Sequence, residues 1–312
     1  TTEIYTLSLH DALPIFIVIN YNSTQYTINC VNSILKFTDN TIDYEIIVVD
    51  NNSEPDEKTK LLNLTENAKI KIVYSKINLG FAGGNMLGVQ HAQGNYYLFI
   101  NNDSVLLKDC IKEFYNYCIK NTNTGIVSSY TKSEEGDLQF NYSHFPTISS
   151  KYFGVSISKL FNNVNYPPKV NTYTSPFNVD LVGGALMFVN AEIFAKLGGF
   201  DTTFFLYCEE EDLALRITKA GYNVTIIPDI TVQHFGSKST EKSLAIKKEF
   251  YISFFYFYRK HYGLFKTLLL RKYLVIKHIK NIFKKDGFTL IRFILQGAHF
   301  KHSLKHKQMI NL

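Results

Sequence analysis

Four consecutive acidic residues, 209–212, form the sharpest cluster of chemically useful side chains in the sequence. They follow the aromatic run FFLYC and begin a predicted helix that continues as DLALRITKAG. Acids stabilise the first turn of a helix through its dipole, and Asp212 is spaced to pair with Arg216. That structural role does not require four acids beside aromatic side chains, where the pKa of a carboxyl group rises. We therefore expect one carboxyl group of this run to act as a general base that accepts a proton from a sugar hydroxyl.

Asp103 and His234 are the candidates for holding a divalent cation. Asp103 ends the apolar run YYLFINND, and a carboxylate at a sheet edge can share Mg²⁺ or Mn²⁺ with a diphosphate. His234 follows a late apolar run, in QHFGS, and could supply a second ligand. A lone histidine is also common as a surface or packing residue, and this alternative stays open.

Polar residues end three of the apolar runs, at 20–22 (NYN), 50–53 (DNNS) and 101–103 (NND). In open α/β sheets ligands bind beyond the carboxyl ends of the strands, so these three clusters are expected at one edge of the sheet. Asn and Asp are also common turn residues, and a plain turn is the alternative for each cluster taken alone.

A glycine-rich segment, NLGFAGGNMLG, lies between a predicted strand and a predicted helix. Gly80 and Gly83 lack a Cβ atom and would allow the backbone to approach a ligand or a neighbouring strand. The spacing is neither G-x-G-x-x-G nor G-K-[ST], which argues against a dinucleotide-binding fold and a P-loop nucleotide hydrolase. The alternative is a turn softened by glycine.

Short apolar, β-branched runs alternate with helical stretches, which predicts an α/β fold with a doubly wound, mostly parallel sheet and helices on both faces. The predicted strands are 16–20, 44–50, 70–75, 96–103 and 223–229, with the apolar segment 181–189 beside them. Residues 131–180 break this rhythm, being rich in Ser, Asn, Tyr and Pro. We expect them to form loops that face a substrate or pack over the sheet.

The 312 residues, 46% of them hydrophobic, fit one large domain at 16–240 with an appendage at 241–312. The appendage carries 16 Lys or Arg against 3 Asp or Glu, although the net charge of the chain is only +6. Such a basic, aromatic, helical tail seeks an anionic partner, either a membrane surface or a nucleic acid.

Four widely spaced cysteines match no zinc, redox or disulfide framework. No apolar run is long enough to span a bilayer, and no signal peptide begins the chain. A cytoplasmic protein is therefore expected. Residues 1–15 contain YTLSLHDALPI, which resembles the translation of a sequencing-adapter oligonucleotide. We predict a non-native leader, with the first strand beginning at Phe16; a natural amphipathic leader is the alternative.

Seven segments in order resemble the glycosyltransferase family 2 enzymes of GT-A fold, especially the rhamnosyltransferase-like branch that builds bacterial surface polysaccharides. They are IVINYNS, VVDNNS, NLGFAGGN, NNDS, VGGALMFV, GGFDTTFFLYCEEEDLALR and QHFGSKS. The resemblance covers roughly residues 16–265, and seven ordered segments are far more specific than any one of them.

The resemblance implies a nucleotide pocket at the ends of the first strands. Asp50 would hydrogen-bond a uracil or thymine base, and three asparagines would line the pocket: Asn20, Asn22 and Asn78. Gly183 and Gly184 in VGGALMFV would leave room for the donor sugar.

The resemblance also implies the groups that carry the reaction. NND stands where the family has a D-x-D-like element, so Asp103 would bind the metal on the diphosphate, with Asn102 beside it and His234 as a further ligand. The family's Glu-Asp pair appears here as Glu209-Glu210, so Glu210 would be the general base, and Glu209 stays the alternative.

The reaction implied is an inverting single displacement that depends on a divalent cation, Mn²⁺ or Mg²⁺. The donor would be a UDP- or dTDP-sugar, since enzymes for glucose, galactose, N-acetylglucosamine and rhamnose share these segments. The acceptor would be a glycan or a lipid-linked glycan of the cell envelope.

The basic tail interleaves aromatic and apolar residues with Lys and Arg at helical spacing, which suits an anionic membrane interface on the inner face of the cytoplasmic membrane. Alternatively, its aromatics close over the catalytic domain or a dimer partner. A nucleic-acid-binding protein is a rival interpretation, but the tail has no recognised RNA or DNA motif and no nucleic acid is expected. A catalytically silent sugar-nucleotide-binding subunit is a second rival.

Overall fold

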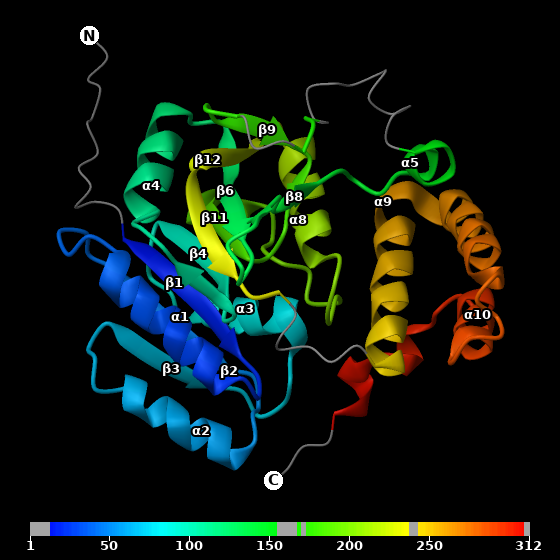
Figure 1. Cartoon of the computed structure of the whole chain (residues 1–312), viewed down its shortest axis with the longest axis horizontal. Coiled ribbons are helices and arrows are strands. Elements are labelled where there is room, and N and C mark those ends of the chain that lie inside the picture. The colour runs from blue at the N-terminus through cyan, green and yellow to red at the C-terminus, as the bar shows by residue number, and fades with distance from the viewer. Residues whose placement is uncertain (1–12, 155–166, 170–172, 237–242, 309–312) are drawn as a thin grey trace.

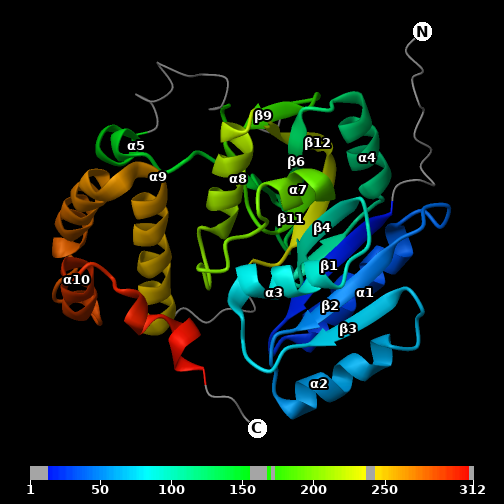
Figure 2. The ribbon, with the colours of Figure 1, turned by 180° about the vertical axis from the view of Figure 1, so that it is seen from behind.

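The apolar runs assemble into one ten-stranded sheet in the part of the chain that the computed structural model describes, residues 13–154, 167–169, 173–236 and 243–308. Helices cover both faces of this sheet, and a C-terminal helical unit lies to one side of it (Figure 1 and Figure 2). The α/β architecture expected from the alternating runs is confirmed.

Four parallel strands form the first half of the sheet: β1 (Pro14–Asn20), β2 (Glu45–Asp50), β3 (Ile70–Tyr74) and β4 (Tyr96–Asn101). The prediction that strand structure begins at Phe16 was wrong by two residues. Ile15 is fully buried and pairs with Glu45 on one side and Tyr97 on the other. Residues 1–12 of the predicted leader lie outside the described residues.

The second half of the sheet is mixed, because β11 (Leu186–Asn190) runs antiparallel to both β4 and β6 (Thr124–Lys132). β12 (Asn223–His234) is parallel to β6, and β5 (Ser104–Leu106) pairs antiparallel with β12 at the edge. The strand order is β3-β2-β1-β4-β11-β6-β12-β5. Among the described strands, six share one direction (β1, β2, β3, β4, β6 and β12), as a mostly parallel sheet requires.

The region 131–180 contains short elements where loops were expected. β7 (Leu138–Gln139) pairs with β6, and β9 (Phe177–Val179) pairs with β12. β8 (Tyr142–Ser143) and β10 (Leu181–Val182) form a separate two-stranded sheet, and α5 (Ile148–Phe153) follows β8. Residues 155–166 and 170–172 of this region lie outside the described part of the chain.

The alternation of side chains along the central strands creates a core on each face of the sheet. Phe16 and Val18 face one cluster, while Ile15 and Ile17 face the other. The first cluster is covered by α1 (Thr24–Phe37), α2 (Pro55–Leu61) with the 3₁₀ turn η2 (Leu62–Leu64), and α4 (Ile111–Lys120). The second is covered by α3 (Gly80–Gln90), α7 (Ala191–Lys196) and α8 (Glu209–Lys219).

The C-terminal unit is a helical hairpin followed by shorter helices. α9 (Leu244–Ile279) breaks at Gly263, where φ is 80° and ψ is 176°. Its two halves fold back on each other, since the Tyr251 hydroxyl lies 2.7 Å from His278 Nε2. α10 (Gly287–Leu295) and the turns η3 (Phe300–His302) and η4 (Leu304–Lys307) complete the unit.

The aromatic residues of the first half of α9 are buried in the same core as α3, α7 and α8; they include Phe254, Phe255, Phe257 and Tyr258. The segment predicted as a tail therefore closes over the α/β part with this half, as one of the two interpretations of the tail expected. The second half and α10 leave large apolar side chains exposed. No helix among the described residues has the length and apolar character needed to cross a bilayer.

Candidate active site

Asn20 is a fully buried junction at the end of β1. Its amide donates to Asp50 Oδ1 (3.0 Å) and to Ser53 Oγ (3.1 Å), and its carbonyl oxygen accepts from the Thr27 hydroxyl (2.7 Å). Asp50, also fully buried, accepts a further hydrogen bond from the backbone N–H of Ser53. The side chain of Asn20 therefore fixes Asp50 and the loop after β2, rather than facing solvent as a pocket-lining residue would.

Asn22 forms the turn that connects β1 to α1. It has a positive φ of 50°, its backbone N–H donates to Ser53 Oγ (2.9 Å), and its side-chain oxygen accepts from the Glu54 N–H (2.8 Å). This exposed asparagine ties the polar ends of β1 and β2 together. Asn22 is therefore a turn residue, as one interpretation expected, and it also lies at the sheet edge where the other interpretation expected a ligand.

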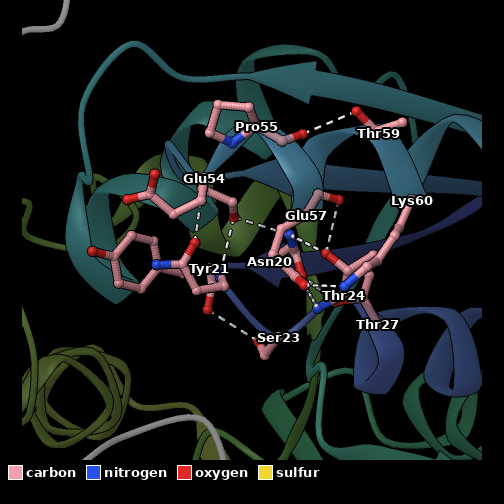
Figure 3. Close-up of polar contacts among 12 residues, drawn as sticks. Asn20, Tyr21, Ser23, Thr24, Thr27, Glu54, Pro55, Glu57, Thr59 and Lys60 are labelled. Atoms are coloured by element: carbon pink, nitrogen blue, oxygen red, sulfur yellow. Dashed lines mark hydrogen bonds and ion pairs between the residues drawn. The ribbon is translucent and has the colours of Figure 1, made fainter.

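The N-terminus of α1 is held by a carboxylate from α2. Glu57 accepts a hydrogen bond from the Thr24 N–H at 2.8 Å, and the Thr24 hydroxyl donates to the Glu57 carbonyl (Figure 3). Its ion pair with Lys60, followed by the hydrogen bonds from Thr24, lowers the pKa of Glu57 to about 2. A negative charge at a helix N-terminus is stabilising, so α1 and α2 fix the strand ends between them.

Asn51 is a positioning residue that the sequence did not single out. Its amide donates to Asn78 Oδ1 (3.0 Å) and to the Gly80 carbonyl (3.0 Å), and its oxygen accepts from the Leu79 N–H (2.9 Å). The glycine-rich segment is thereby attached to the end of β2, and Asn78 lies beside the loop that follows Asp50. Asn51 stands in the DNNS cluster, but nothing in the sequence separates it from its neighbours.

Gly80 allows a close contact with the aromatic run that precedes the acidic residues, rather than with a ligand. Phe81 N–H donates to the Phe205 carbonyl at 2.8 Å, and a Cβ atom on Gly80 would lie 1.9 Å from that oxygen. Gly83 is similarly close to protein, since a Cβ there would lie 2.9 Å from Leu79 Cβ. The glycines of this segment thus permit close packing of the protein on itself.

Asp103 and His234 are brought together by the antiparallel pairing of β5 and β12. His234 pairs with Ser104, and Phe235 N–H donates to the Asp103 carbonyl at 2.9 Å. His234 Nε2 lies 3.2 Å from Asp103 Oδ1, but the two atoms are not aligned as a hydrogen bond and Nε2 is buried without a hydrogen-bond partner. When two ligand atoms bind one cation at right angles, each at about 2.1 Å, they lie about 3 Å from each other.

This pair accordingly fits two ligands of a cation, with further ligands to come from a bound molecule. Within the described residues, no three or more His, Cys, Asp or Glu side chains gather as a complete site. Asn102 does not join the pair: its amide donates to Ser23 Oγ (2.7 Å) and Thr27 Oγ1 (3.0 Å). Its side chain fastens β4 to α1.

The acidic run begins α8 after two strained residues. Tyr207 and Cys208 have positive φ values of 74° and 68°, which non-glycine residues adopt at a cost of about 1–2 kcal/mol each. The turn presents Glu210 to the segment before β11, where its Oε1 accepts from the Gly184 N–H at 3.0 Å. A Cβ on Gly184 would lie 2.5 Å from that oxygen, so glycine is required there; a Cβ on Gly183 would meet Asn141 instead.

Crowding and burial raise the pKa values of the first three acids. Burial, followed by the charge of Glu211, raises the pKa of Glu210 to about 7. Burial and then the charge of Glu210 raise the pKa of Glu209 well above its ordinary value, and Glu209 Oε2 is buried without a hydrogen-bond partner. Glu210 is only half-buried. Of the two glutamates, Glu210 has the access and the pKa of a general base near neutral pH.

Asp212 stabilises the fold rather than the reaction. It pairs with Arg216 (2.8 Å), as the spacing predicted, and also with Lys260 (2.6 Å) and His261 (2.7 Å) of α9. Although burial favours its neutral form, these hydrogen bonds and charges keep the pKa of Asp212 below the ordinary value. Lys260 also pairs with Asp201 (2.7 Å), so α9 holds both ends of the acidic segment.

The Asp103–His234 pair and Glu210 are both linked to one short segment of backbone, Gly184–Ala185. Gly184 N–H binds Glu210, and the carbonyl of the next residue, Ala185, accepts from the Ser104 hydroxyl at 3.2 Å. Ser104 directly follows Asp103. The structure therefore brings together Asp103, His234, Gly184 and Glu210, drawn from four distant parts of the sequence.

Comparisons with known proteins show which family and which fold this chain resembles. The family model described as glycosyl transferase family 2 matches residues 15–190. Rhamnosyltransferase WbbL of Escherichia coli (strain K12) is 28% identical over 165 residues, which cover 50% of this chain and 61% of WbbL. The low-salt glycan biosynthesis hexosyltransferase Agl10 of Haloferax volcanii is 25% identical over 213 residues, covering 67% of this chain and 62% of Agl10. The chain thus spans about three fifths of the length of either relative.

Among solved structures, the crystal structure of GalNAc-T7 with UDP, GalNAc and Mn²⁺ is similar to this chain with a TM-score of 0.63. The sequences are 14% identical, and the match covers 92% of this chain and 55% of that one. The likeness shows a shared fold of the GT-A type.

Replacing Gly80 by alanine should destabilise the protein by about 2–4 kcal/mol, because the new Cβ would overlap the Phe205 carbonyl in addition to straining a positive φ. Gly136→Ala is the matched control, since its φ is also positive but nothing lies within 4 Å, and about 1–2 kcal/mol is expected. Urea denaturation measures both values. Equal losses would contradict the proposed contact.

Glu209→Gln should stabilise the protein at high pH. The raised pKa means that the folded state favours the protonated acid, so this contribution to stability is present below the ordinary value of 4.5 and is lost as the pH rises through the raised pKa. The variant's melting temperature should exceed that of the wild type by about 2–6 °C more at pH 8.5 than at pH 5.5. Glu192→Gln, at an exposed position, is the control. If Glu209→Gln changed the melting temperature by the same amount at both pH values, the raised pKa of Glu209 would be refuted.

Proposed function

The chain belongs to glycosyl transferase family 2, and from this premise we propose that it transfers a sugar from a UDP- or dTDP-sugar to an acceptor hydroxyl, with inversion at the anomeric carbon. The observation that carries the proposal is the meeting of Asp103, His234 and Glu210 around Gly184 and Ala185. Displacement of a nucleoside diphosphate by a hydroxyl needs a cation to neutralise the diphosphate and a base that is ionised near neutral pH. One edge of the sheet offers two cation ligands and a base whose pKa lies in that range.

The donor nucleotide would lie over the ends of β1 and β2. Asp50 would recognise the uracil or thymine base, with Asn22 and Asn78 at the border of the pocket. The buried contacts of Asn20 support a role in holding Asp50 in place, and those of Asn51 support a role in holding the loop 78–80. Gly183 and Gly184 would lie beneath the donor sugar.

Asp103 and His234 would hold the divalent cation, Mn²⁺ or Mg²⁺. Their oxygen and nitrogen atoms stand at the separation that two ligands of one cation require, and His234 Nε2 has no other partner. Mn²⁺ is present together with UDP in the structure of GalNAc-T7. When bound, the cation would neutralise negative charge on the diphosphate.

Glu210 would remove the proton from the acceptor hydroxyl as its oxygen attacks the anomeric carbon. The attack comes from the face opposite the diphosphate, so the configuration at that carbon inverts. The charge of Glu211 raises the pKa of Glu210 and so makes its carboxylate a stronger base, and the Gly184 N–H orients it. Glu209 is buried and would not contact the acceptor.

The exposed apolar residues of the C-terminal unit would bind an anionic membrane surface, on which a lipid-linked glycan acceptor resides. In the second half of α9, in α10 and in the turn between them, they include Phe265, Ile276, Ile279, Phe283 and Phe288, at 58–100% exposure. Lys266, Lys280, Lys284 and Lys285 lie among them in the sequence. Aromatic anchors mixed with lysines suit the interface of an anionic bilayer, here the inner face of the cytoplasmic membrane.

The donor site is tested by the shift in melting temperature on adding UDP, dTDP, GDP or ADP, each with and without Mn²⁺. UDP or dTDP should stabilise the wild type in a metal-dependent way, by about 2.7 kcal/mol at a ligand concentration 100 times Kd. Asp103→Asn and His234→Ala should lose this shift. Asp229→Asn, an exposed residue of the same strand β12, should keep it. No shift with any nucleotide in the folded wild type would refute the transferase proposal.

The base is tested by Glu210→Gln, which should keep the nucleotide shift but lower the transfer rate by about 10²–10⁴-fold. Because the base must be ionised, the wild-type rate should rise about tenfold per pH unit below the pKa of about 7 and level off above it. Glu211→Gln should retain measurable transfer with this profile moved to lower pH, because the neighbouring negative charge that raises the pKa of Glu210 is lost. A Glu210→Gln variant with normal transfer would exclude Glu210 as the base.

Membrane binding is tested by co-sedimentation with vesicles of phosphatidylglycerol and phosphatidylcholine. Phe265→Ser with Phe283→Ser should weaken binding about tenfold or more, since each phenylalanine contributes roughly 1.5–3 kcal/mol when buried. Leu62→Ser with Tyr74→Ser, at exposed positions of the α/β part, is the control and should bind normally. Equal vesicle binding by both double variants would show that these phenylalanines do not bind the membrane.

A further inference from the structure

A cavity of about 210 Å³ lies between the α/β part and the C-terminal hairpin. Its lining comes from β8 and β10, from α5, from the start of α8 and from both halves of α9, and includes His144, Lys151, Glu211, Tyr251, Tyr273 and Lys277. Figure 1 shows α5 next to the hairpin, on the side away from β1 to β3. The volume is below the roughly 300–1,000 Å³ of pockets for drug-sized ligands, so it suits one sugar ring or one phosphate group.

Two lysines from different elements share this cavity. Lys151 extends from α5 across the ring of Phe254, with its Nζ 5.4 Å from the ring centre. Burial, and then the charge of Lys277, lowers the pKa of Lys151. In the stretches of chain that the structure describes, neither lysine forms an ion pair with a carboxylate. The carboxylate of Glu211, which lines the same cavity, offsets one of these two positive charges, and the other is left for a bound anion to neutralise.

The cavity adjoins the proposed general base. Glu211, which lines the cavity, follows Glu210 in the first turn of α8, and Leu181, which also lines it, lies three residues before Gly184. Gly184 binds Glu210 directly. A molecule in the cavity would therefore contact the first turn of α8, the same turn that carries Glu210, on the side of the chain that the donor nucleotide residues do not occupy.

We propose that this cavity binds the acceptor through a phosphate group, with Lys151 and Lys277 as the phosphate-binding residues and Glu211 accepting a hydroxyl of the attached sugar. The inference rests on the proposed function and names the class of acceptor: a sugar carrying phosphate at a short distance from the attacking hydroxyl. Two ammonium groups match the charge of about −2 on a phosphate monoester near neutral pH. The aromatic rings around them would cover the apolar face of the sugar.

The test uses the full chain and isothermal titration calorimetry with three soluble probes: glucose 1-phosphate, methyl glucuronide and methyl glucoside. Titrations are run with and without UDP and Mn²⁺, so that binding of the sugar phosphate at the donor site is separated from binding in the cavity. The variants are Lys151→Gln with Lys277→Gln, the charge-conserving Lys151→Arg with Lys277→Arg, and the control Lys247→Gln with Lys272→Gln. The control pair is exposed on α9, lies outside the cavity lining and removes the same charge.

Glucose 1-phosphate should bind the wild type at least about tenfold more tightly than methyl glucoside, and the Lys151/Lys277 glutamine variant should lose that difference. The arginine variant should keep most of it, and the Lys247/Lys272 control should keep all of it. Equal weakening in the control and in the cavity variant would overturn the inference in favour of general attraction by the basic surface. Glucuronide binding as tight as that of the phosphate would overturn the phosphate assignment.

The melting-temperature shift with UDP and Mn²⁺, measured on every variant, separates this inference from the proposed function. A normal shift in the glutamine variant shows that it is folded and has its donor site. If the wild type shows the melting-temperature shift but binds glucose 1-phosphate no more tightly than methyl glucoside, the acceptor inference fails while the proposed function stands. If the wild type binds glucose 1-phosphate through the two lysines but shows no nucleotide shift, the proposed function fails at its donor site.

Discussion

The backbone of Gly184 and Ala185 is the constraint on which the candidate site depends. One N–H of this segment holds Glu210, and the next carbonyl holds Ser104, the neighbour of Asp103. The segment leads into β11, which pairs with β4 and β6 in the middle of the sheet and is therefore among its least mobile parts. Glu210 on α8 and the Asp103–His234 pair, which lies at the start of β5 and the end of β12, are thus held by one segment of backbone. Any side chain at Gly184 would displace Glu210.

The acidic segment in turn depends on elements far from it in the chain. Its turn contains two strained residues, Tyr207 and Cys208, which persist only where surrounding contacts fix them. Those contacts are the Phe205 carbonyl against Phe81 N–H and the ion pairs of Asp212 with Lys260 and His261. The first half of α9 is consequently part of the scaffold of the site, although the charge balance of the sequence marked it as part of a separate tail.

Sequence patterns predicted the elements that are apolar and regular, but not the pairings that complete the site. The four parallel strands, the acid run and the Asp103–His234 pair could be inferred, because buried strands and strand ends have local signatures. β5 is three residues long and has none, yet it is what places Asp103 beside His234. Asn20, Asn51 and Asn102 have the same side chain, and only their tertiary partners show that all three position other groups.

The distinction between Glu209 and Glu210 illustrates why a site residue cannot be assigned from residue type alone. Burial raises the pKa of both glutamates, and the charge of Glu210 raises the pKa of Glu209 further. Their backbone positions differ by about 100° around the helix, so one carboxylate reaches Gly184 while the other enters the core without a complete set of partners. An unpaired buried carboxylate destabilises the fold, and the raised pKa of Glu209 reduces this cost because the folded state favours the uncharged acid. The residue type is the same at both positions, so the partners and the exposure that the turn gives each carboxyl group decide which of them can serve as the proposed base.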